Sequence, residues 1–266
     1  CKTAVLRSDF LRARQPEGRP GTGKTDQTKA DMENREGKPY DWPQPPSQTA
    51  IPIARTGYPL IAALAFVTVI FALLEMALPA LVFLAATLFA CLFFRDPERV
   101  TPTAMGAVVS PADGKVIKSE VAETDYLEGE RLRISIFMNV FNVHVNRIPC
   151  EGTVTRIQYH PGKFFSANLD KASRENEHNA VYVRTGENGE IVFVQIAGLV
   201  ARRIVCGLRE GDAVARGERF GMICLGSRLD VYLPADARPE VAVGDKVRAG
   251  TSILAYLRGT DHVENV

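Results

Sequence analysis

The sequence predicts a mainly β protein, a β-sandwich or barrel built from hairpin repeats and preceded by an apolar helical hairpin anchor. Three observations in the chain of 266 residues favour this class. Residues 59–94 are apolar except for one charged side chain, Glu75. After residue 100, apolar residues alternate with polar ones, which is typical of strands. The motif GDxVxxG occurs twice in the second half of the chain and indicates repeated strand-turn units.

The overall composition is that of an ordinary globular protein and excludes several classes. The 32 Lys and Arg residues balance 31 Asp and Glu residues, and the formal net charge of +1 gives no electrostatic case for a nucleic-acid binder. The five cysteines are odd in number, widely spaced and free of any CxxC pair, which argues against a disulfide framework or a zinc site. We expect reduced thiols in a protein that faces the cytosol.

The first segment, residues 1–50, is rich in Pro, Gly and charged residues and lacks apolar periodicity after Leu11. Such a composition cannot bury enough apolar surface to offset the entropy of ordering, so we predict a disordered leader. Residues 18–25 match the letters of a phosphate-binding loop, but their flanks fit neither a strand nor a helix. Because the chain begins with Cys and Met32 lies just before the ordered part, we hypothesise that residues 1–31 lie upstream of the natural start.

Residues 51–98 are predicted to form a membrane-anchoring hairpin of two apolar helices, over 60–74 and 78–94. The apolar run is too long for one spanning helix of about 20 residues and slightly short for two. Glu75 and Pro79 lie near its middle, where a turn would expose them. At a rise of about 1.5 Å per residue, each helix would be roughly 25 Å long, just short of a hydrocarbon core of about 30 Å.

Charges at the two ends of the hairpin indicate its orientation. Arg55 precedes the first helix and Arg95 follows the second, so both ends are expected on the cytoplasmic face of the cell (inner) membrane. Two alternatives are a hairpin buried in a soluble core and a cleaved signal peptide. The length and the internal position of the apolar run disfavour the signal peptide.

Residues 99–266 are predicted to form a β-rich catalytic domain. Apolar residues fall on even positions over 132–140 and on odd positions over 141–145. Because side chains alternate between the two faces of a strand, this change of phase predicts a bulge or a break. The side chains that then share one face are those of Asn142, His144 and Asn146. Further strands are predicted over 180–184, 190–196, 200–206 and 228–233, and a short helix over 165–175.

An internal repeat links distant parts of this domain. GDAVARG at 211–217 recurs as GDKVRAG at 244–250, and SPADGKVIKSEV at 110–121 is a looser third copy. The Gly-Asp pair favours a tight turn and the following Val begins a strand. The pattern resembles the hairpins of biotinyl/lipoyl-like β-sandwiches, although no lysine is a convincing carrier residue at a hairpin tip. We therefore predict an architectural role for the repeat.

Few residues qualify for catalysis or metal binding. The four histidines, which form no HExxH or similar pair and therefore predict no metal site, are His144, His160, His178 and His262. Neither the GxSxG elbow of hydrolases nor a Gly-rich dinucleotide fingerprint occurs. The pair Gly226-Ser227 stands out because it lies between two apolar, strand-like segments, where an ordinary turn would be more polar.

Six segments together carry a family resemblance that covers roughly residues 50–260. They are FFRDPER (93–99), SPADGKV (110–116), NVHVNRIPCEG (142–152), YHPGKFFSANLDKAS (159–173), AGLVARRIVC (197–206) and LGSRLDVYLP (225–234). In the order and spacing of these segments, the sequence closely resembles the phosphatidylserine decarboxylases of the short bacterial type. Two positions depart from the long type, which has Thr where Arg228 stands and a second histidine where Arg147 stands.

The resemblance implies an enzyme that makes its own cofactor. Ser227 would attack the Gly226 carbonyl, the chain would break between them, and Ser227 would become a pyruvoyl group. His144 would activate the hydroxyl and later protonate a carbanion, and Asp113 would orient or charge it. The pyruvoyl carbonyl would form a Schiff base with the amine of phosphatidylserine, carbon dioxide would leave, and phosphatidylethanolamine would result. Neither a metal nor pyridoxal phosphate is implied.

The implied partners are phosphatidylserine, the membrane, and the large and small chains that one proenzyme yields. Whether the mature enzyme forms a homodimer is left open by the sequence. Two other functions remain alternatives. One is a membrane-anchored adaptor that uses biotinyl/lipoyl-like hairpins without catalysis. The other is a decarboxylase of a related lipid with a different headgroup.

Overall fold

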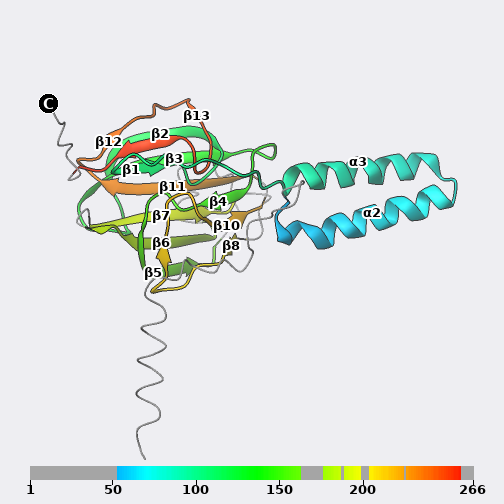
Figure 1. Ribbon diagram of the computed structural model, residues 1–266, viewed down its shortest axis with the longest axis horizontal. Helices are drawn as coiled ribbons and strands as arrows, with labels where there is room; N and C mark the ends of the chain where they lie inside the picture. Colours follow the sequence, from blue (N-terminus) through cyan, green and yellow to red (C-terminus); the bar gives the residue numbers. More distant parts are fainter. Residues whose placement is uncertain (1–52, 163–175, 187–188, 199–203, 225, 259–266) are drawn as a thin grey trace, which may run out of the picture. The chain divides into compact units, whose positions relative to one another are not determined.

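The computed structural model describes residues 53–162, 176–186, 189–198, 204–224 and 226–258 (Figure 1). Three sequence predictions lie outside these residues: the leader over 1–50 with its proposed start at Met32, the short helix over 165–175, and the first part of the strand over 200–206.

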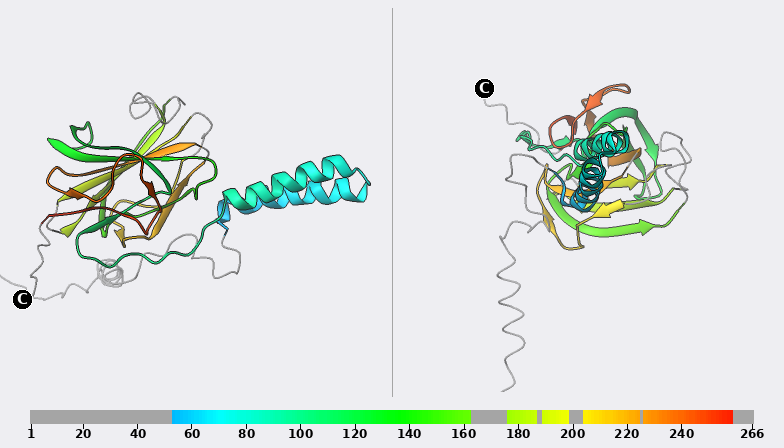
Figure 2. Two further views of the ribbon diagram at one scale, coloured as in Figure 1. Left: turned by 90° about the horizontal axis from the view of Figure 1, so that it is seen from above. Right: turned by 90° about the vertical axis from the view of Figure 1, so that its right-hand side faces the viewer.

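The apolar segment folds as a helical hairpin (Figures 1 and 2). A short 3-10 helix, η1 (Arg55–Gly57), leads into α2 (Tyr58–Leu73), and α3 (Ala77–Phe93) returns beside it. These bounds lie within two residues of those predicted, because long apolar runs without breakers define helices well. The rings of Phe71 and Phe83 stack across the pair, with their centroids 5.5 Å apart.

The surface of the hairpin is apolar and largely exposed. No residue of α2 is buried, and the segment Arg55–Leu73 is long and apolar enough to cross a membrane. α3 is a shorter apolar helix. This exposure contradicts the alternative of a hairpin buried in a soluble core. At the turn, Glu75 has a φ of 57°, in the left-handed region that ends a helix sharply.

The remaining described chain is built mainly of antiparallel strands, which confirms the mainly β class. Their bounds are β1 (Ala107–Val109), β2 (Gly114–Glu123), β3 (Glu130–Met138), β4 (Val145–Arg147), β5 (Gly152–His160), β6 (His178–Arg184), β7 (Glu190–Ile196), β8 (Ile204–Cys206), β9 (Ala213–Val214), β10 (Arg219–Ile223), β11 (Ser227–Pro234), β12 (Arg238–Pro239), β13 (Lys246–Val247) and β14 (Ile253–Tyr256).

One large sheet and two small ones enclose the core. The large sheet has the order β13-β2-β3-β11-β7-β6-β5-β9, and the small sheets have the orders β1-β14-β12 and β4-β10-β8. Alternate side chains of the large sheet, such as Ile134, Phe193 and Leu229, are fully buried and pack with Val108 and Phe220 of the small sheets. The opposite face of β6, β7 and β11 is buried as well, against a second cluster that includes Tyr182, Val194 and Tyr232.

The large sheet repeats one hydrogen-bond pattern on either side of its central strands, β7 and β11. From one edge the order is β13-β2-β3-β11, and from the other it is β9-β5-β6-β7. The contacts between the halves are reciprocal: the Val109 amide donates to the Pro149 carbonyl at 2.8 Å, and the Arg147 amide donates to the Pro111 carbonyl at 2.9 Å. SPADG at 110–114 therefore corresponds to IPCEG at 148–152.

The GDxVxxG repeats occupy equivalent places in these halves. The Gly211 amide donates to the Val154 carbonyl and the Gly244 amide to the Val116 carbonyl, both at 2.8 Å. Each repeat thereby adds a two-residue strand, β9 or β13, to one edge of the sheet. The predicted third copy at 110–121 is wrong, because this segment supplies β2, the strand to which the second repeat binds.

The predicted change of phase near residue 140 is a break between strands. β3 ends at Met138, and β4 begins at Val145. Between them the Asn139 side chain accepts a hydrogen bond from the Phe141 amide at 2.9 Å, which closes a tight turn. The Phe141 side chain is 65% exposed at this turn.

Candidate active site

Ser227 begins β11, at a point where the backbone changes conformation. It is fully buried, it pairs with Met138 at the end of β3, and its hydroxyl donates to the Met138 sulfur at 3.5 Å. The preceding residue, Gly226, has a φ of +65°, in the left-handed region that favours glycine. No atom lies within 4 Å of a Cβ built at Gly226, so backbone conformation rather than crowding selects glycine here.

His144 lies just before β4, and the anchor helix covers it. Its carbonyl accepts a hydrogen bond from the amide of Ile223, four positions before Ser227, at 3.4 Å. Its ring is fully buried and stacks on the ring of Phe93, the last residue of α3, with centroids 4.0 Å apart. Among the described residues, no side chain forms a hydrogen bond with either ring nitrogen.

This environment keeps the His144 imidazole neutral. Burial and, as the smaller cause, the positive charge of Arg95 lower the pKa of His144 to about 4, although the Asp113 carboxylate acts in the opposite direction. Near pH 7 the ring is therefore uncharged and has a nitrogen lone pair that can accept a proton.

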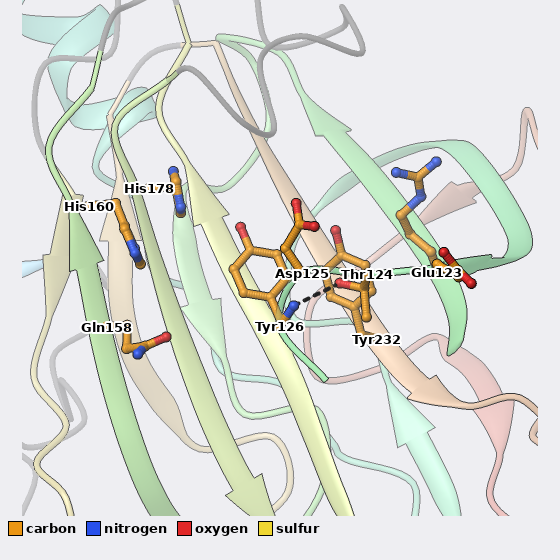
Figure 3. A pocket seen from close by; sticks show the side chains of 9 residues that line it. Glu123, Thr124, Asp125, Tyr126, Gln158, His160, His178 and Tyr232 are labelled. Carbon is orange, nitrogen blue, oxygen red and sulfur yellow. Dashed lines mark hydrogen bonds between the residues drawn. The ribbon is translucent and has the colours of Figure 1, made fainter. Parts of the chain in front are cut away.

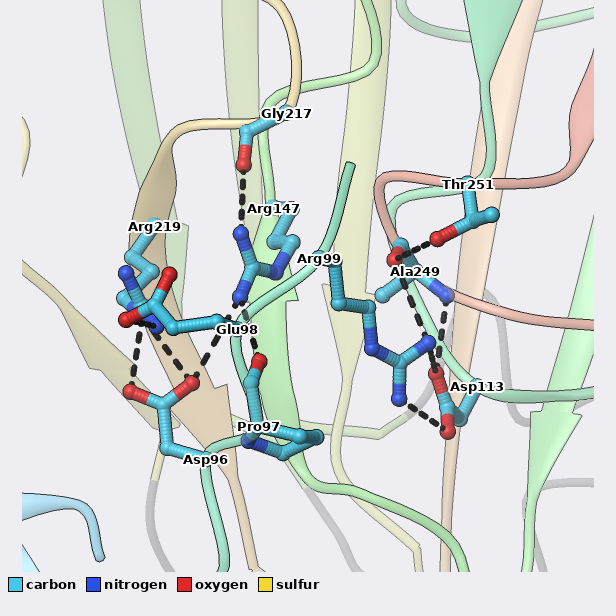
Figure 4. A network of polar contacts seen from close by, with 10 residues as sticks. All are labelled: Asp96, Pro97, Glu98, Arg99, Asp113, Arg147, Gly217, Arg219, Ala249 and Thr251. Atoms are coloured by element: carbon cyan, nitrogen blue, oxygen red, sulfur yellow. Dashed lines mark hydrogen bonds and ion pairs between the residues drawn. The ribbon is translucent and has the colours of Figure 1, made fainter. Parts of the chain in front are cut away.

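Asp113 lies between β1 and β2 and binds two partners on separate parts of the chain (Figure 4). Its Oδ1 accepts a hydrogen bond from the Ala249 amide at 2.8 Å, and its two oxygens face Arg99 at 2.8 and 2.9 Å. Both side chains of this ion pair are nearly buried. These contacts, rather than a hydrogen bond to His144, hold the carboxylate. A direct triad contact is therefore not formed, and Asp113 acts on His144 through its charge.

A second ionic cluster follows the anchor helix (Figure 4). Arg219 binds both oxygens of Asp96, at 2.7 and 2.9 Å. Arg147 donates to the carbonyls of Gly217 and Pro97, at 2.9 and 3.0 Å. Burial and the nearby Arg219 lower the pKa of Arg147 to about 10, so it stays a cation. Arg147 thus fastens the segment after α3 to the first repeat.

A chain of buried amides continues from the Ser227 contact into the core. The Met138 sulfur lies 3.9 Å from the Asn146 side-chain nitrogen, Asn146 accepts a hydrogen bond from Gln195 at 2.9 Å, and Asn179 donates to Gln195 at 3.1 Å. The sequence pointed only to Asn146, as a neighbour of His144 on one face. A lone polar residue in an otherwise apolar strand was the signal available for Gln195.

Arg228, the residue directly after Ser227, faces away from it. It forms a fully buried ion pair with Asp230, two positions along the same strand, and its Nε lies 2.6 Å from the carboxylate. Successive side chains of a strand point to opposite faces, so this pair lies behind the sheet as seen from Ser227. It holds the beginning of β11 in place.

A separate pocket of about 290 Å³ contains none of the predicted catalytic residues (Figure 3). Its lining includes Tyr126 and Tyr232, and the rings of His160 and His178 stack 4.6 Å apart beside them. Burial raises the pKa of Tyr126, which therefore stays protonated near pH 7. In the part of the chain that the structure describes, no group of three or more His, Cys, Asp or Glu side chains could hold a metal ion.

Comparisons with known proteins agree on one family. The family model described as phosphatidylserine decarboxylase matches residues 86–255. A phosphatidylserine decarboxylase proenzyme from Syntrophus aciditrophicus is 55% identical over 76% of this chain and 96% of its own length. A proenzyme of the same name from Desulfotalea psychrophila is 50% identical over 79% of this chain and 99% of its own length. Another from Nitratidesulfovibrio vulgaris is 53% identical over 77% of this chain and 95% of its own length.

Proposed function

Because the chain belongs to the phosphatidylserine decarboxylase family, we propose that it cleaves itself between Gly226 and Ser227. The protein is a carboxy-lyase that converts phosphatidylserine into phosphatidylethanolamine and is made as a proenzyme. This function replaces the adaptor and the altered headgroup considered from the sequence. The observation that carries the proposed site is a buried Ser227 that directly follows a left-handed glycine. It lies four positions after Ile223, whose amide donates to the His144 carbonyl.

Self-cleavage begins with attack of the Ser227 hydroxyl oxygen on the Gly226 carbonyl carbon. The peptide C–N bond breaks, and an ester joins the Ser227 oxygen to Gly226 while the Ser227 nitrogen becomes an amine. Loss of the Cα proton then expels the Gly226 carboxylate and leaves a dehydroalanine. One water molecule enters and one ammonia leaves, which converts this residue into the pyruvoyl group of the small chain. No external oxidant or reductant is needed.

His144 is the base that accepts the Ser227 proton. A serine hydroxyl is a weak nucleophile at its ordinary pKa, so an adjacent base must activate it. The buried imidazole is uncharged near pH 7 because its pKa is about 4, so a nitrogen lone pair is free to take the proton, and the nearby Asp113 charge raises its affinity for that proton. In the decarboxylation, the same nitrogen returns a proton to the carbon from which carbon dioxide has left.

Asp113 supports His144 electrostatically. Its negative charge stabilises the imidazolium that forms when His144 takes the proton, and the Arg99 and Ala249 contacts keep the carboxylate in place. Asp113 thus acts on His144 through its negative charge and not through a hydrogen bond.

The surroundings of Ser227 fit a pyruvoyl group made from it. The Ser227 side chain touches a thioether rather than a strong acceptor, so it is not locked before reaction. Ser227 is fully buried, so the new carbonyl would form inside the fold rather than in bulk solvent. A pyruvoyl carbonyl supplies an electron sink for the decarboxylation of an amino acid, without metal or pyridoxal phosphate.

The hairpin of α2 and α3 is the membrane anchor in this proposal. A lipid substrate must be met at the bilayer surface, and the exposed apolar helices provide the affinity for it. Phe93 of α3 also stacks on His144. Insertion of the anchor into a bilayer would therefore place the active site next to the lipid headgroups. The positions of Arg55 and Arg95 support placement on the cytoplasmic face of the inner membrane.

The GDxVxxG hairpins support a biotinyl/lipoyl-like arrangement of the β domain. Their equivalent amide contacts and the paired halves of the sheet are the features that such an arrangement requires. In this proposal the repeat is purely architectural, since it carries no attached cofactor.

Substitution of Ser227 tests the site. Ser227→Ala should remain one uncleaved chain on a denaturing gel and release no carbon dioxide from phosphatidylserine. Ser135→Ala is the matched control, because Ser135 is also fully buried but lies on β3 and faces away from Ser227. It should be cleaved and active. Cleavage of Ser227→Ala at the normal position would refute the assignment.

A further inference from the structure

Arg95 joins the end of the anchor to the turn that precedes His144. Its guanidinium donates to the Leu92 carbonyl at 2.7 Å, in the last turn of α3, and to the Phe141 carbonyl at 2.6 Å. The ring of Phe93, two residues earlier, stacks on His144. Arg95 therefore occupies the same corner of the molecule as the proposed base, and its charge acts on His144.

Arg95 differs from the other arginines around the site in lacking a carboxylate partner. Arg99, Arg147 and Arg219 each have an Asp oxygen within 4 Å. Arg95 forms no ion pair with any carboxylate in the described ranges, and its two contacts are to neutral carbonyls. A guanidinium has more N–H donors than two carbonyls use, and its fork matches the oxygens of a phosphate.

The position of Arg95 along the anchor matches the headgroup layer of a membrane. Leu88 and Leu92 of α3 are 61% and 46% exposed, and Phe141 beside Arg95 is 65% exposed. Arg95 is the first charged residue after this apolar surface. With the hairpin in a bilayer, its guanidinium lies at the depth where lipid phosphates lie.

We propose that Arg95 binds the phosphate of the phosphatidylserine headgroup and so places the serine moiety beside Ser227 and His144. This inference rests on the function proposed above. Phosphatidylserine also has a carboxylate, but that charge disappears when carbon dioxide leaves, so an arginine on it would stabilise the substrate more than the transition state. The phosphate keeps its charge throughout. Its contact with Arg95 therefore strengthens binding of substrate and transition state alike.

The test compares Arg95→Gln with wild type and with Arg55→Gln, in neutral detergent micelles where phosphatidylserine is the only anionic lipid. Arg55 is the matched control because it lies at the base of the other helix of the hairpin. Arg95→Gln should still yield two chains, its KM should rise roughly 10- to 100-fold, as for a lost charge-assisted hydrogen bond, and its kcat should stay within about threefold. Arg55→Gln should resemble wild type.

A second substrate shows whether the phosphate itself is the group that Arg95 binds. A phosphatidylserine analogue whose phosphate is methylated, and therefore neutral, should raise the KM of wild type by about the same factor and leave that of Arg95→Gln nearly unchanged. An unchanged KM in Arg95→Gln, or an equal response of both enzymes to methylation, would overturn the inference. If wild type itself released no carbon dioxide from phosphatidylserine, the proposed function would fail instead.

Arg95→Lys keeps the measurement decisive if the Gln variant remains uncleaved. Lysine retains the charge but not the forked geometry, so discrimination between the natural and the methylated substrate should shrink several-fold. Discrimination equal to that of wild type would contradict a role for Arg95 in phosphate binding.

Discussion

The two halves of the eight-stranded sheet share a hydrogen-bond pattern but differ in the side chains that this pattern positions. Asp113 and Glu151 occupy equivalent places, each directly before the glycine that begins β2 or β5. The Asp113 side chain is 11% exposed and paired with Arg99, whereas that of Glu151 is 60% exposed and paired with Arg216. The same backbone geometry therefore holds a buried acid in one half and an ordinary surface ion pair in the other.

The central strands show the same contrast. Both begin after a glycine with positive φ, Gly226 before β11 and Gly189 before β7. The first residue of β11 is the buried Ser227, whereas that of β7 is the partly exposed Glu190. A tight turn before a strand is thus part of the architecture, and the chemistry depends on which side chain follows it. His144 comes from the other half, so the proposed site forms where the halves and the anchor meet.

The largest effect is expected from removing the buried charge in one half only. Asp113→Asn should slow self-cleavage by at least about 100-fold, because His144 loses the charge that stabilises its protonated form. It should also lower the free energy of unfolding by about 2–3 kcal/mol, since Arg99 loses its counter-ion. Glu151→Gln should change the stability by less than about 0.5 kcal/mol and leave cleavage intact. Gel assays of cleavage and urea titrations measure both, and equal effects of the two substitutions would contradict the comparison.

The two left-handed glycines provide the next test. Gly226→Ala and Gly189→Ala should each cost about 1 kcal/mol of stability, because neither site is crowded and only the backbone conformation is strained. Cleavage should slow in Gly226→Ala alone, as its carbonyl moves relative to the Ser227 hydroxyl. Thermal unfolding and a time course of chain cleavage separate the two effects. Equally slow cleavage in Gly189→Ala would contradict a specific role of Gly226, because it would show that general destabilisation of the sheet is enough to slow cleavage.

The anchor's contact with His144 predicts a change in pH dependence. In wild type, His144 becomes protonated only as the pH falls through about 4, so cleavage should persist in mild acid. Phe93→Ala exposes the ring to water and raises its pKa toward the ordinary value of about 6.5, so the acidic loss of cleavage should begin at higher pH. Phe94→Ala, which removes a neighbouring buried ring without the His144 stack, is the control. Identical pH profiles for the two variants would contradict a specific role of Phe93.

The smallest effect is expected where the halves are alike. Asp212 and Asp245 accept equivalent hydrogen bonds from the amides of Arg209 and Ala242, at 2.6 and 2.8 Å. Asp212→Ala and Asp245→Ala should each cost about 1 kcal/mol and leave the specific activity of the folded enzyme unchanged. A large difference in stability between them, measured by urea titration, would show that the two repeats are not equivalent.

Local patterns were enough to predict much of the fold but not the contacts of the site. The predicted strand over 190–196 coincides with β7, a short and nearly continuous apolar run that is buried on both faces. The ion pair of Arg99 with Asp113 was not predicted. Such a contact depends on which strands become neighbours, and local periodicity does not contain that information. Ser227 was found through its family resemblance, since Gly-Ser before a strand is by itself an ordinary turn.

The intact mass of the purified protein tests the central claim most directly. We predict two chains separated between Gly226 and Ser227, with the small chain lighter by one ammonia than a fragment that begins with serine. A pyruvoyl terminus accounts for that difference, and it should also block Edman degradation. An enzyme that decarboxylates phosphatidylserine at full rate as one uncleaved polypeptide would contradict the account.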